Sequence, residues 1–316
     1  MPAGVVIGPG DDAAVIEPVR GQLDVLTTDA QVEGVHFDRR FVPPDAIGHR
    51  ALAVNLSDLA AMGATPRAAL LSLALPDALE LAAFDGFLDG LLGLADQHGV
   101  ALIGGNITRT TGPLVVDVTA VGAVHRRRFL TRSGARAGDE VFVTGTLGNA
   151  AAGLLRLQAS LADADNAGTH PGFGEQAARY LRPEPRVRAG RLLAGNRAAS
   201  SCIDLSDGLA DGVRQIAAAS RVGITLDGSA VPITEALRAW GAAVGRDPLD
   251  LALSGGDDFE LLFTIRPKRA GALRTVRRQL GSLPITRIGV VTRTPELLLR
   301  HERGTRELPE GYEHFR

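Results

Sequence analysis

Residues 53–64 read AVNLSDLAAMGA, and this stretch decides how the N-terminal half of the chain folds. Leucine recurs here at three- and four-residue spacing with alanine between, which predicts a buried helix that Gly63 ends. Asn55 and Asp58 interrupt the apolar surface three residues apart, so both belong to one helical face. A carboxylate in such a place is costly unless it caps a helix, is paired, or binds a metal.

The composition limits the class of protein. A length of 316 residues suggests two domains, and 45% hydrophobic with 22% charged residues is typical of a globular protein. A net charge of −2 is not the strong positive charge that is typical of a nucleic-acid-binding protein. Cys202 is the single cysteine, so no intramolecular disulfide forms. We see no signal-peptide pattern and no apolar run long enough to cross a membrane, and therefore expect a cytoplasmic protein.

Strand and helix patterns mix in both halves, which predicts an α+β fold of two domains. In the first half we expect strands at 23–28, 68–75, 100–103 and 114–124, a helix from Pro43 through Asp58, a helix at 79–98, and a turn-rich polar segment at 104–109. In the second half we expect strands at 140–144, 198–205, 259–265, 285–291 and 296–300, helices from Asn149 and at 209–219, an irregular insertion at 159–175, and a rigid surface segment at 182–185. The basic stretch 126–138 separates the halves, and we divide the chain into domains 1–134 and 135–316.

Acidic clusters of one form recur along the chain. Each follows a short apolar segment and ends in aspartate: GDD at 10–12, TTD at 27–29, DLSD at 204–207 and GGDD at 255–258, with Asp58 as a fifth site. Carboxylates that converge cannot all stay ionised without cations. Hard divalent cations prefer oxygen ligands, and Mg²⁺ is commonly shared between carboxylates and substrate phosphates. The set therefore favours Mg²⁺–nucleotide over zinc, although surface turns also favour Asp and Gly.

The usual nucleotide-binding motifs are not in the sequence. It has neither the P-loop pattern, nor a Gly-x-Gly-x-x-Gly opening a helix, nor the protein-kinase catalytic loop. If the chain binds ATP, it does so by another route. The related segments NLSDLA at 55–60 and DLSDGLA at 204–210 suggest that two related domains supply it.

An ordered set of motifs resembles the thiamine-monophosphate kinase family, of the aminoimidazole-ribonucleotide-synthetase-like superfamily. The motifs are GDDAAV (10–15), TTD (27–29), VEGVHF (32–37), NLSDLAAMGA (55–64), LTRSGA (130–135), DLSDGL (204–209) and SGGDDFEL (254–261). The resemblance implies a homodimer whose N-terminal domains pair into a β-barrel-like core. It also implies a cleft between the two domains that holds ATP and several Mg²⁺ ions. The implied reaction transfers the γ-phosphate of ATP directly onto thiamine monophosphate and gives thiamine diphosphate.

The same resemblance assigns roles to single positions. Metal ligands would be Asp12, Thr27, Thr28, Asp29, Asp58, Asn106, Asp204 and Asp207. ATP would be contacted by Gly105, Asn106, Arg132 and Ser206, and thiamine monophosphate by His36, Asp257 and Phe315. Phosphoryl transfer needs alignment and neutralised charge more than covalent chemistry, and no catalytic side chain is assigned beyond these ligands.

Some positions have simpler explanations, and one departs from the family. His36 also fits a packed histidine, Arg132 a solvated charge, and Phe315 a frayed terminus. The family usually has Gly-Gly-Asp-Thr where this chain has GGNI at 104–107. Asn106 offers a carbonyl oxygen without charge, so a metal held there would bind more weakly.

Two other functions remain open from the sequence. One is another ATP-dependent enzyme of the same superfamily that activates an amide or an oxygen; the chain lacks the N-terminal Cys/Lys pair and the C-terminal cysteine of such relatives. The other is a non-catalytic nucleotide-binding dimer, which only Asn106 supports. In each case we expect no nucleic-acid and no membrane partner.

Overall fold

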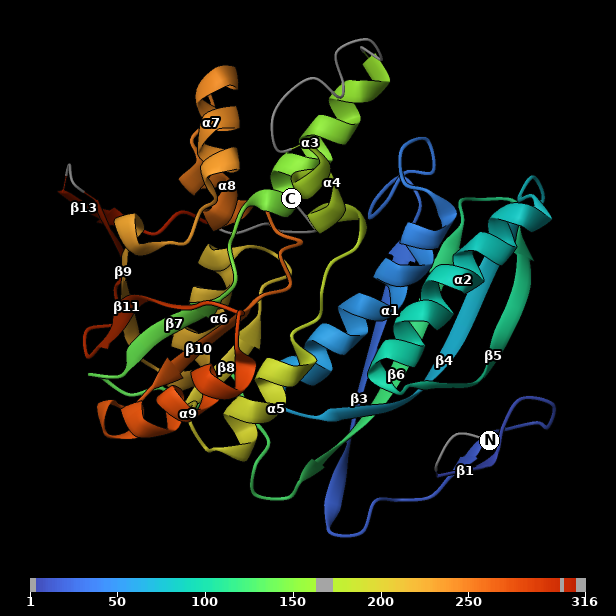
Figure 1. The fold of residues 1–316 in the computed structure, drawn as a ribbon, viewed down its shortest axis with the longest axis horizontal. Coiled ribbons are helices and arrows are strands. Elements are labelled where there is room, and N and C mark those ends of the chain that lie inside the picture. Colours follow the sequence, from blue (N-terminus) through green and yellow to red (C-terminus); the bar gives the residue numbers. More distant parts are fainter. Residues whose placement is uncertain (1–3, 163–172, 302–303, 311–316) are drawn as a thin grey trace. The chain divides into compact units, whose positions relative to one another are not determined.

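The computed structural model describes residues 4–162, 173–301 and 304–310. The chain divides into two compact units (Figure 1): unit 1 comprises Met1–Leu59 and Ala64–Arg127, and unit 2 comprises Ala60–Gly63 and Arg128–Arg316. Apart from Ala60–Gly63, which belong to unit 2, the division falls between Arg127 and Arg128, within the basic stretch 126–138. Both units contain helices as well as strands.

Unit 1 is a sheet with helices on one face. Its elements are β1 (Val5–Ile7), β2 (Val15–Ile16), β3 (Gln22–Val32), α1 (Pro44–Ala61), β4 (Thr65–Pro76), α2 (Leu81–His98), β5 (Ala101–Thr110) and β6 (Val115–His125). Among the described residues, four strands form the sheet in the order β3-β6-β4-β5, with β4 and β5 parallel and the other neighbours antiparallel. The β1–β2 hairpin packs Val5 and Ile16 against apolar side chains of this sheet.

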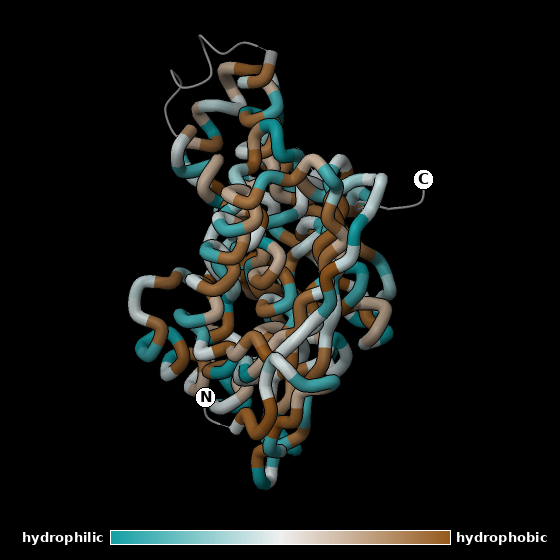
Figure 2. The backbone as a smooth tube through the Cα atoms, turned by 90° about the vertical axis from the view of Figure 1, so that its right-hand side faces the viewer, coloured by the Kyte–Doolittle hydropathy of each residue, from teal (hydrophilic) through white to brown (hydrophobic). Residues whose placement is uncertain are grey.

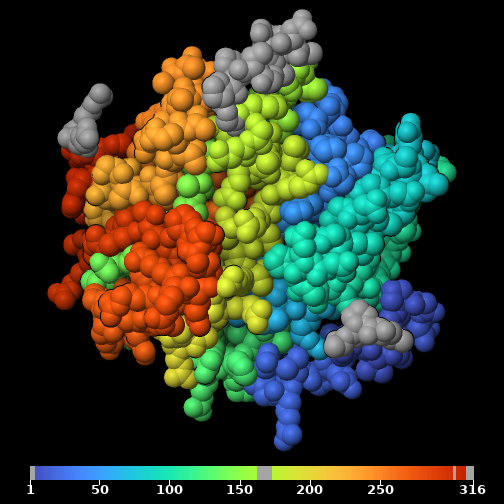
Figure 3. Space-filling model, viewed as in Figure 1, coloured from blue at the N-terminus to red at the C-terminus, as the bar shows by residue number. Residues whose placement is uncertain are grey.

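Helices α1 and α2 cover the same face of the sheet, and glycines let them approach closely (Figure 1). A Cβ added at Gly48 of α1 would lie 1.8 Å from the carbonyl oxygen of Phe87, and one at Gly90 of α2 would lie 1.8 Å from that of Asp45. Helix α2 buries Phe87 and Leu91 on one side, and its other side lies at the molecular surface (Figure 3). The amphipathic pattern at 79–98 therefore predicted this helix correctly.

Unit 2 contains a larger mixed sheet with helices around it. Its elements are β7 (Glu140–Thr144), α3 (Asn149–Ala162), α4 (Phe173–Leu181), α5 (Val187–Gly195), β8 (Ser201–Asp204), α6 (Leu209–Ser220), β9 (Gly223–Asp227), η1 (Gly228–Ala230), α7 (Glu235–Val244), α8 (Pro248–Ser254), β10 (Leu261–Ile265), η2 (Pro267–Arg269), α9 (Ala270–Leu280), β11 (Ile285–Thr292), β12 (Leu297–His301) and β13 (Gly304–Glu307). In the described ranges, seven strands run in the order β13-β12-β9-β11-β7-β10-β8. Only the β12–β9 pair among them is parallel.

The core of unit 2 lies between this sheet and α6. Leu209, Val213 and Ile216 on one side of α6 are fully buried, and the same hydrophobic cluster includes Leu226 of β9 and Ile288 of β11. In Figure 2 apolar and polar residues alternate repeatedly along the backbone, as expected for elements with one buried face. Because α6 begins directly after the acidic segment 204–207, this packing fixes where that segment lies.

The α+β prediction is confirmed, and two local expectations are wrong. The polar segment 104–109 is not a turn but the continuation of β5, because it pairs in parallel with β4 over its whole length. The segment 182–185 is not wholly at the surface, since Pro183 and Pro185 are buried. Most of the insertion expected at 159–175 lies outside the described residues. No helix in the described ranges is long and apolar enough to cross a membrane.

Candidate active site

The helix-facing side of β3 in unit 1 carries hydroxyl and carboxylate oxygens. Thr27 Oγ1 donates a hydrogen bond to Asp58 Oδ2 of α1 at 2.5 Å. Side chains alternate along a strand, so Asp29 points to the same face as Thr27. All three are half-buried. Oxygen donors that stay partly open to solvent suit Mg²⁺, which keeps several waters, so the residues present here fit that ion.

Thr28 lies between these residues in sequence but faces the other way. Its hydroxyl is 3.0 Å from Asp117 Oδ1 and 3.0 Å from Thr119 Oγ1, both on the neighbouring strand β6. The sequence placed Thr27, Thr28 and Asp29 in one metal cluster. The structure joins Thr27 to Asp58 by a hydrogen bond and places Asp29 on the same face of β3, and it turns the side chain of Thr28 to the opposite face of the sheet.

The other residues of unit 1 that were expected to bind metal or ATP are exposed to solvent. Asp12 is exposed in the loop between β1 and β2, where its N–H donates to Asp11 Oδ1 at 2.9 Å. Gly105 and Asn106 are exposed residues of β5. Gly105 has a φ of 156°, and a Cβ there would lie 1.8 Å from the carbonyl oxygen of Leu71, so only glycine fits.

Carboxylates alone do not complete a metal site. Among the described residues, no three His, Cys, Asp or Glu side chains form a group that could hold a metal ion. An ion bound by the residues of unit 1 therefore needs threonine, asparagine, water or phosphate oxygens to complete its coordination. This is the situation in which a bound nucleotide contributes ligands.

His36 lies in a turn whose hydrogen bonds determine which nitrogen of the neutral imidazole carries the proton. The backbone N–H of Val32 donates to His36 Nδ1 at 3.1 Å, and the backbone N–H of His36 donates to the Val32 carbonyl at 2.9 Å. Because Nδ1 accepts a hydrogen bond, the proton of the neutral imidazole lies on Nε2. His36 can thus donate one hydrogen bond from Nε2.

In unit 2 the structure joins two acidic segments that the sequence treated separately. The N–H of Asp257 donates to the Ser206 carbonyl at 2.6 Å, and the N–H of Phe259 donates to the Leu205 carbonyl at 2.9 Å. A Cβ on Gly256 would lie 2.6 Å from the Ser206 carbonyl oxygen, so the two backbones are in direct contact. Segments 204–207 and 255–258 therefore form one acidic surface.

The side chains on this surface differ in exposure. Asp204 is buried with 7% exposure, Asp207 and Asp257 are half-buried, and Ser206 is exposed. Ser206 Oγ donates to Asp207 Oδ2 at 2.8 Å. The surface thus presents one hydroxyl and two accessible carboxylates, which are ligands for a cation or for a polar substrate.

The loop around Arg132 is held by a residue that sequence reasoning missed. Ser220 Oγ, at the end of α6, accepts from the N–H groups of Gly134 and Ala135 at 3.1 Å and lies 3.3 Å from the Arg132 carbonyl. The Arg132 side chain is exposed. Helix α6 therefore has Asp207 just before its start and supports the Arg132 loop at its end.

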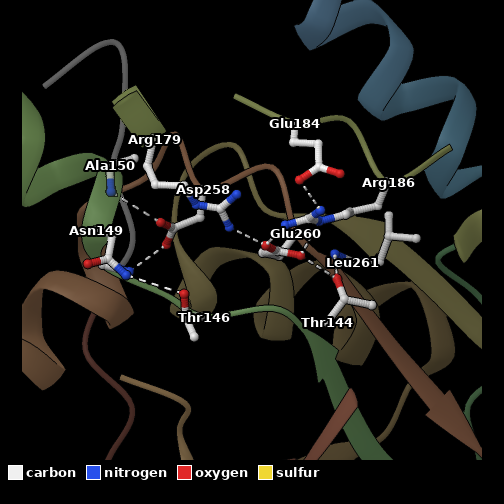
Figure 4. A network of polar contacts seen from close by, with 11 residues as sticks. Thr144, Thr146, Asn149, Ala150, Arg179, Glu184, Arg186, Asp258, Glu260 and Leu261 are labelled. Carbon is white, nitrogen blue, oxygen red and sulfur yellow. Dashed lines mark hydrogen bonds and ion pairs between the residues drawn. The ribbon is translucent and has the colours of Figure 1, made fainter. Parts of the chain in front are cut away.

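Sequence reasoning also missed a buried ionic network next to Asp257 (Figure 4). Glu260 is fully buried, and its carboxylate accepts two hydrogen bonds from Arg186, one from Arg179 and one from the Thr144 hydroxyl, at 2.5–2.7 Å. Burial alone would lower the pKa of Arg186, but its hydrogen bonds to Glu260 and the charge of Glu260 raise it. The Arg186 guanidinium therefore stays charged. No local pattern predicts this pairing, since Glu260 lies 74 residues from Arg186.

Asp258 occupies the N-terminus of α3. Its Oδ2 accepts from the Gly148 N–H at 2.8 Å, and its Oδ1 lies 3.5 Å from the Ala150 nitrogen. Burial raises the pKa of Asp258 to about 7, opposed by the Gly148 hydrogen bond and reinforced by the charge of Glu260. Asp258 is thus a buried cap, unlike the half-exposed Asp257 beside it.

Two residues named in the sequence analysis remain. Phe315, expected to contact the substrate, lies outside the described residues. Cys202 is buried, and its burial raises the pKa of the thiol, so it has none of the character of a reactive cysteine.

Comparison with known proteins defines the class first. The family model for the N-terminal domain of AIR synthase related proteins matches residues 10–124, and the model for their C-terminal domain matches residues 136–302. Fold and acidic surfaces therefore define a two-domain AIR synthase related protein. Among curated relatives, the thiamine-monophosphate kinase of Escherichia coli O157:H7 is 42% identical over 315 residues, which cover 98% of this chain and 92% of the relative.

Solved structures narrow the class to one family. The thiamine-monophosphate kinase of Stenotrophomonas maltophilia K279a superposes with a TM-score of 0.83 at 42% identity, covering 94% of this chain and 91% of that one. AaThiL complexed with AMPPCP and TMP superposes with a TM-score of 0.82 at 32% identity, covering 95% and 89%. The chain belongs to the thiamine-monophosphate kinase family, as the motif order had indicated.

Proposed function

We propose that the chain is a thiamine-phosphate kinase. A phosphate oxygen of thiamine monophosphate attacks the γ-phosphorus of ATP, the bond to the bridging oxygen breaks, and thiamine diphosphate and ADP leave. The observation that carries this proposal is full-length similarity to a protein whose structure was solved with AMPPCP, an ATP analogue, and TMP, the abbreviation of thiamine monophosphate. Curated thiamine-monophosphate kinases at 42% identity support the same reaction.

We propose Mg²⁺ as the metal, because the available donors are carboxylate, hydroxyl and amide oxygens. In unit 1 the helix-facing set Thr27, Asp29 and Asp58 is the best-formed group, with Asp12 and Asn106 as further ligands. In unit 2 the ligands are Asp204 and Asp207. When bound, Mg²⁺ neutralises the charge that develops on the phosphates during transfer.

The protein's own residues orient the two substrates. His36 can donate from Nε2 toward a phosphate or hydroxyl of thiamine monophosphate, since its Nδ1 is held by Val32. Asp257 offers a half-exposed carboxylate for the same substrate. We assign Gly105, Arg132 and Ser206 to ATP, in agreement with their exposed positions. Positioning of this kind, rather than a covalent intermediate on the enzyme, is what direct phosphoryl transfer requires.

We further propose that unit 1 pairs with a second copy of the chain through the sheet face opposite α1 and α2. That face bears Thr28 and Thr119, and it exposes Leu26 at 68% and Leu70 at 38%. The β1–β2 hairpin covers only part of this face, where it packs on Ala68 and Val121. Exposed aliphatic side chains on the rest of such a face are typical of an interface. Cytoplasmic location stays a prediction from the sequence.

Product analysis tests the reaction. The protein is incubated with ATP, Mg²⁺ and thiamine monophosphate, and a parallel reaction replaces the monophosphate with free thiamine. We expect thiamine diphosphate only in the first reaction. ATP binding without any diphosphate product would overturn the proposal and make Asn106→Asp the next variant to examine.

A further inference from the structure

The segment that carries Asp257 has an unusual backbone. Gly256, Asp257 and Phe259 all have positive φ angles, of 71°, 60° and 49°. Glycine adopts this region freely, but Asp and Phe do so only at an energetic cost. Such conformations persist where the surrounding structure holds them, and they cluster at functional sites.

One side of the segment is held by backbone hydrogen bonds. Asp257 and Phe259 donate to the carbonyls of Ser206 and Leu205, and Leu205 donates back to the Glu260 carbonyl at 2.9 Å. These bonds fix where the segment lies beside residues 204–206. They hold the segment from this side only.

The other side is held by the two acidic side chains that follow Asp257. Asp258 reaches the backbone N–H groups at the start of α3, and Glu260 reaches Arg179, Arg186 and Thr144 (Figure 4). Both are buried, with 5% and 0% exposure. Asp257 alone among the three stays half-exposed, so the buried anchors hold the segment from the inside while its side chain remains accessible.

Thr144 links the carboxylate to the strand. Its hydroxyl donates to Glu260 Oε2 at 2.6 Å and accepts from the N–H of Leu261 at 2.9 Å. Gly145 leaves room for this arrangement, since a Cβ there would lie 2.0 Å from Glu260 Oε1. The position of the Glu260 carboxylate is thus set by strand β7 as well as by the arginines.

We propose that Asp258 and Glu260 are positioning residues that hold Asp257 in the left-handed conformation in which it binds thiamine monophosphate. The inference rests on the proposed function and names residues to which no role has been assigned. Neither side chain is exposed enough to touch a substrate, so both act through Asp257. Loosening either anchor should weaken the use of thiamine monophosphate more than it weakens ATP binding, because segment 204–206 is also anchored by the pairing of β8 with β10.

Thr144 offers the sharpest test because it lies outside the site. Thr144→Val keeps the shape but removes the hydroxyl from Glu260 and Leu261, whereas Thr144→Ser keeps the hydroxyl. Thr264→Val is the matched control: Thr264 is fully buried on β10, and its hydroxyl lies 2.7 Å from those of Ser200 and Ser201, not near Glu260.

We expect Thr144→Val to raise the KM for thiamine monophosphate about tenfold, with the Kd for ATP changed less than about threefold. Thr144→Ser should restore the KM to within about threefold of the wild-type value. Thr264→Val should lower the Tm about as much as Thr144→Val but leave both substrate constants unchanged. A KM for thiamine monophosphate that is unchanged in Thr144→Val, or raised equally in Thr264→Val, would overturn the inference.

A glycine pair gives a second, independent test. Gly138 and Gly145 flank strand β7, and both have positive φ, of 91° and 61°. Alanine at either position adds backbone strain, but only at Gly145 does the methyl group collide with Glu260, since nothing lies within 4 Å of a Cβ at Gly138. We expect Gly145→Ala, and not Gly138→Ala, to raise the KM for thiamine monophosphate; equal KM values in the two variants would contradict the proposal.

These outcomes are separate from failure of the proposed function. If wild-type protein makes no thiamine diphosphate, the proposed reaction is wrong, whatever the variants do. If the wild type is active and the KM of Thr144→Val is unchanged, the reaction stands and only the positioning roles of Asp258 and Glu260 fall.

Discussion

Two acidic regions of the molecule look alike in sequence and differ in structure. Asp29 and Asp58 of unit 1 are half-buried, and Asp58 is hydrogen-bonded by a threonine hydroxyl. Asp258 and Glu260 of unit 2 are buried, and their partners are backbone N–H groups, arginines and a threonine. Carboxylates left partly open can take a cation or a substrate, whereas enclosed and fully paired carboxylates hold the backbone. For these four carboxylates accessibility, more than the Gly-Asp pattern, separates binding residues from structural ones, whereas Asp204 is a proposed ligand with only 7% exposure.

Asp58→Asn should give the largest change in activity. Asparagine keeps the shape and can still accept from Thr27, but it removes the charge that a metal ion needs. We expect kcat to fall by about 10³-fold, comparable to the loss of a group that stabilises transition-state charge. The Tm should change little. Steady-state kinetics and thermal unfolding check this, and normal turnover in the variant would remove Asp58 from the metal site.

Glu260→Gln, unlike Asp58→Asn, should lower the stability of the fold strongly. The change leaves the buried Arg186 without a full counter-charge, and breaking a buried ion pair in this way costs about 3–5 kcal/mol. We expect the free energy of unfolding, measured by denaturant titration, to fall by that amount. Arg40→Gln is the control, because its pair with Asp38 lies at the surface, where water screens it, and its loss should change stability little. Equal losses in the two variants would remove the distinction between buried and open carboxylates.

The pH dependence of stability should identify Asp258. Burial raises its pKa to about 7, well above its ordinary value, so the folded state binds a proton that the unfolded state has released. The stabilisation is therefore present at low pH and is lost as the pH rises through about 7. Relative to Asp258→Asn, the wild type should lose about 2 kcal/mol between about pH 5 and about pH 8. A difference between the two proteins that stays constant with pH would contradict the buried, protonated state.

The smallest effects should separate Thr27 from Thr28. Thr27→Val removes the hydroxyl beside Asp58 and should raise the Mg²⁺ concentration needed for half-maximal activity by about tenfold. Thr28→Val alters only the opposite face of the sheet and should change that concentration by less than about threefold. If Thr28→Val raises that Mg²⁺ concentration as much as Thr27→Val does, the hydroxyl of Thr28 belongs to the metal site, as the motif suggested.

The broad fold could be predicted from the sequence because its signals are local. Apolar spacing located α1, α2 and α6, and β-branched runs located β6 and β7 within a few residues. The segment 104–109 was misjudged because its glycines suggested a turn, whereas pairing with β4 extends the strand through them. The hydrogen bonds from Arg186 to Glu260 could not be predicted at all, since the two residues are 74 apart in sequence and no motif pairs them. Motif order indicated the candidate ligands, but only the alternation of side chains on β3 distinguished Thr27 from Thr28.

The most direct test of phosphoryl transfer between the two substrates follows the γ-phosphate of ATP in a single turnover. Wild-type protein in excess over γ-labelled ATP is mixed with thiamine monophosphate and Mg²⁺, and the reaction is stopped at intervals. We predict that the label moves from ATP to thiamine diphosphate with no labelled protein in between. Label released as inorganic phosphate, or retained on the protein, would contradict direct transfer between the two substrates.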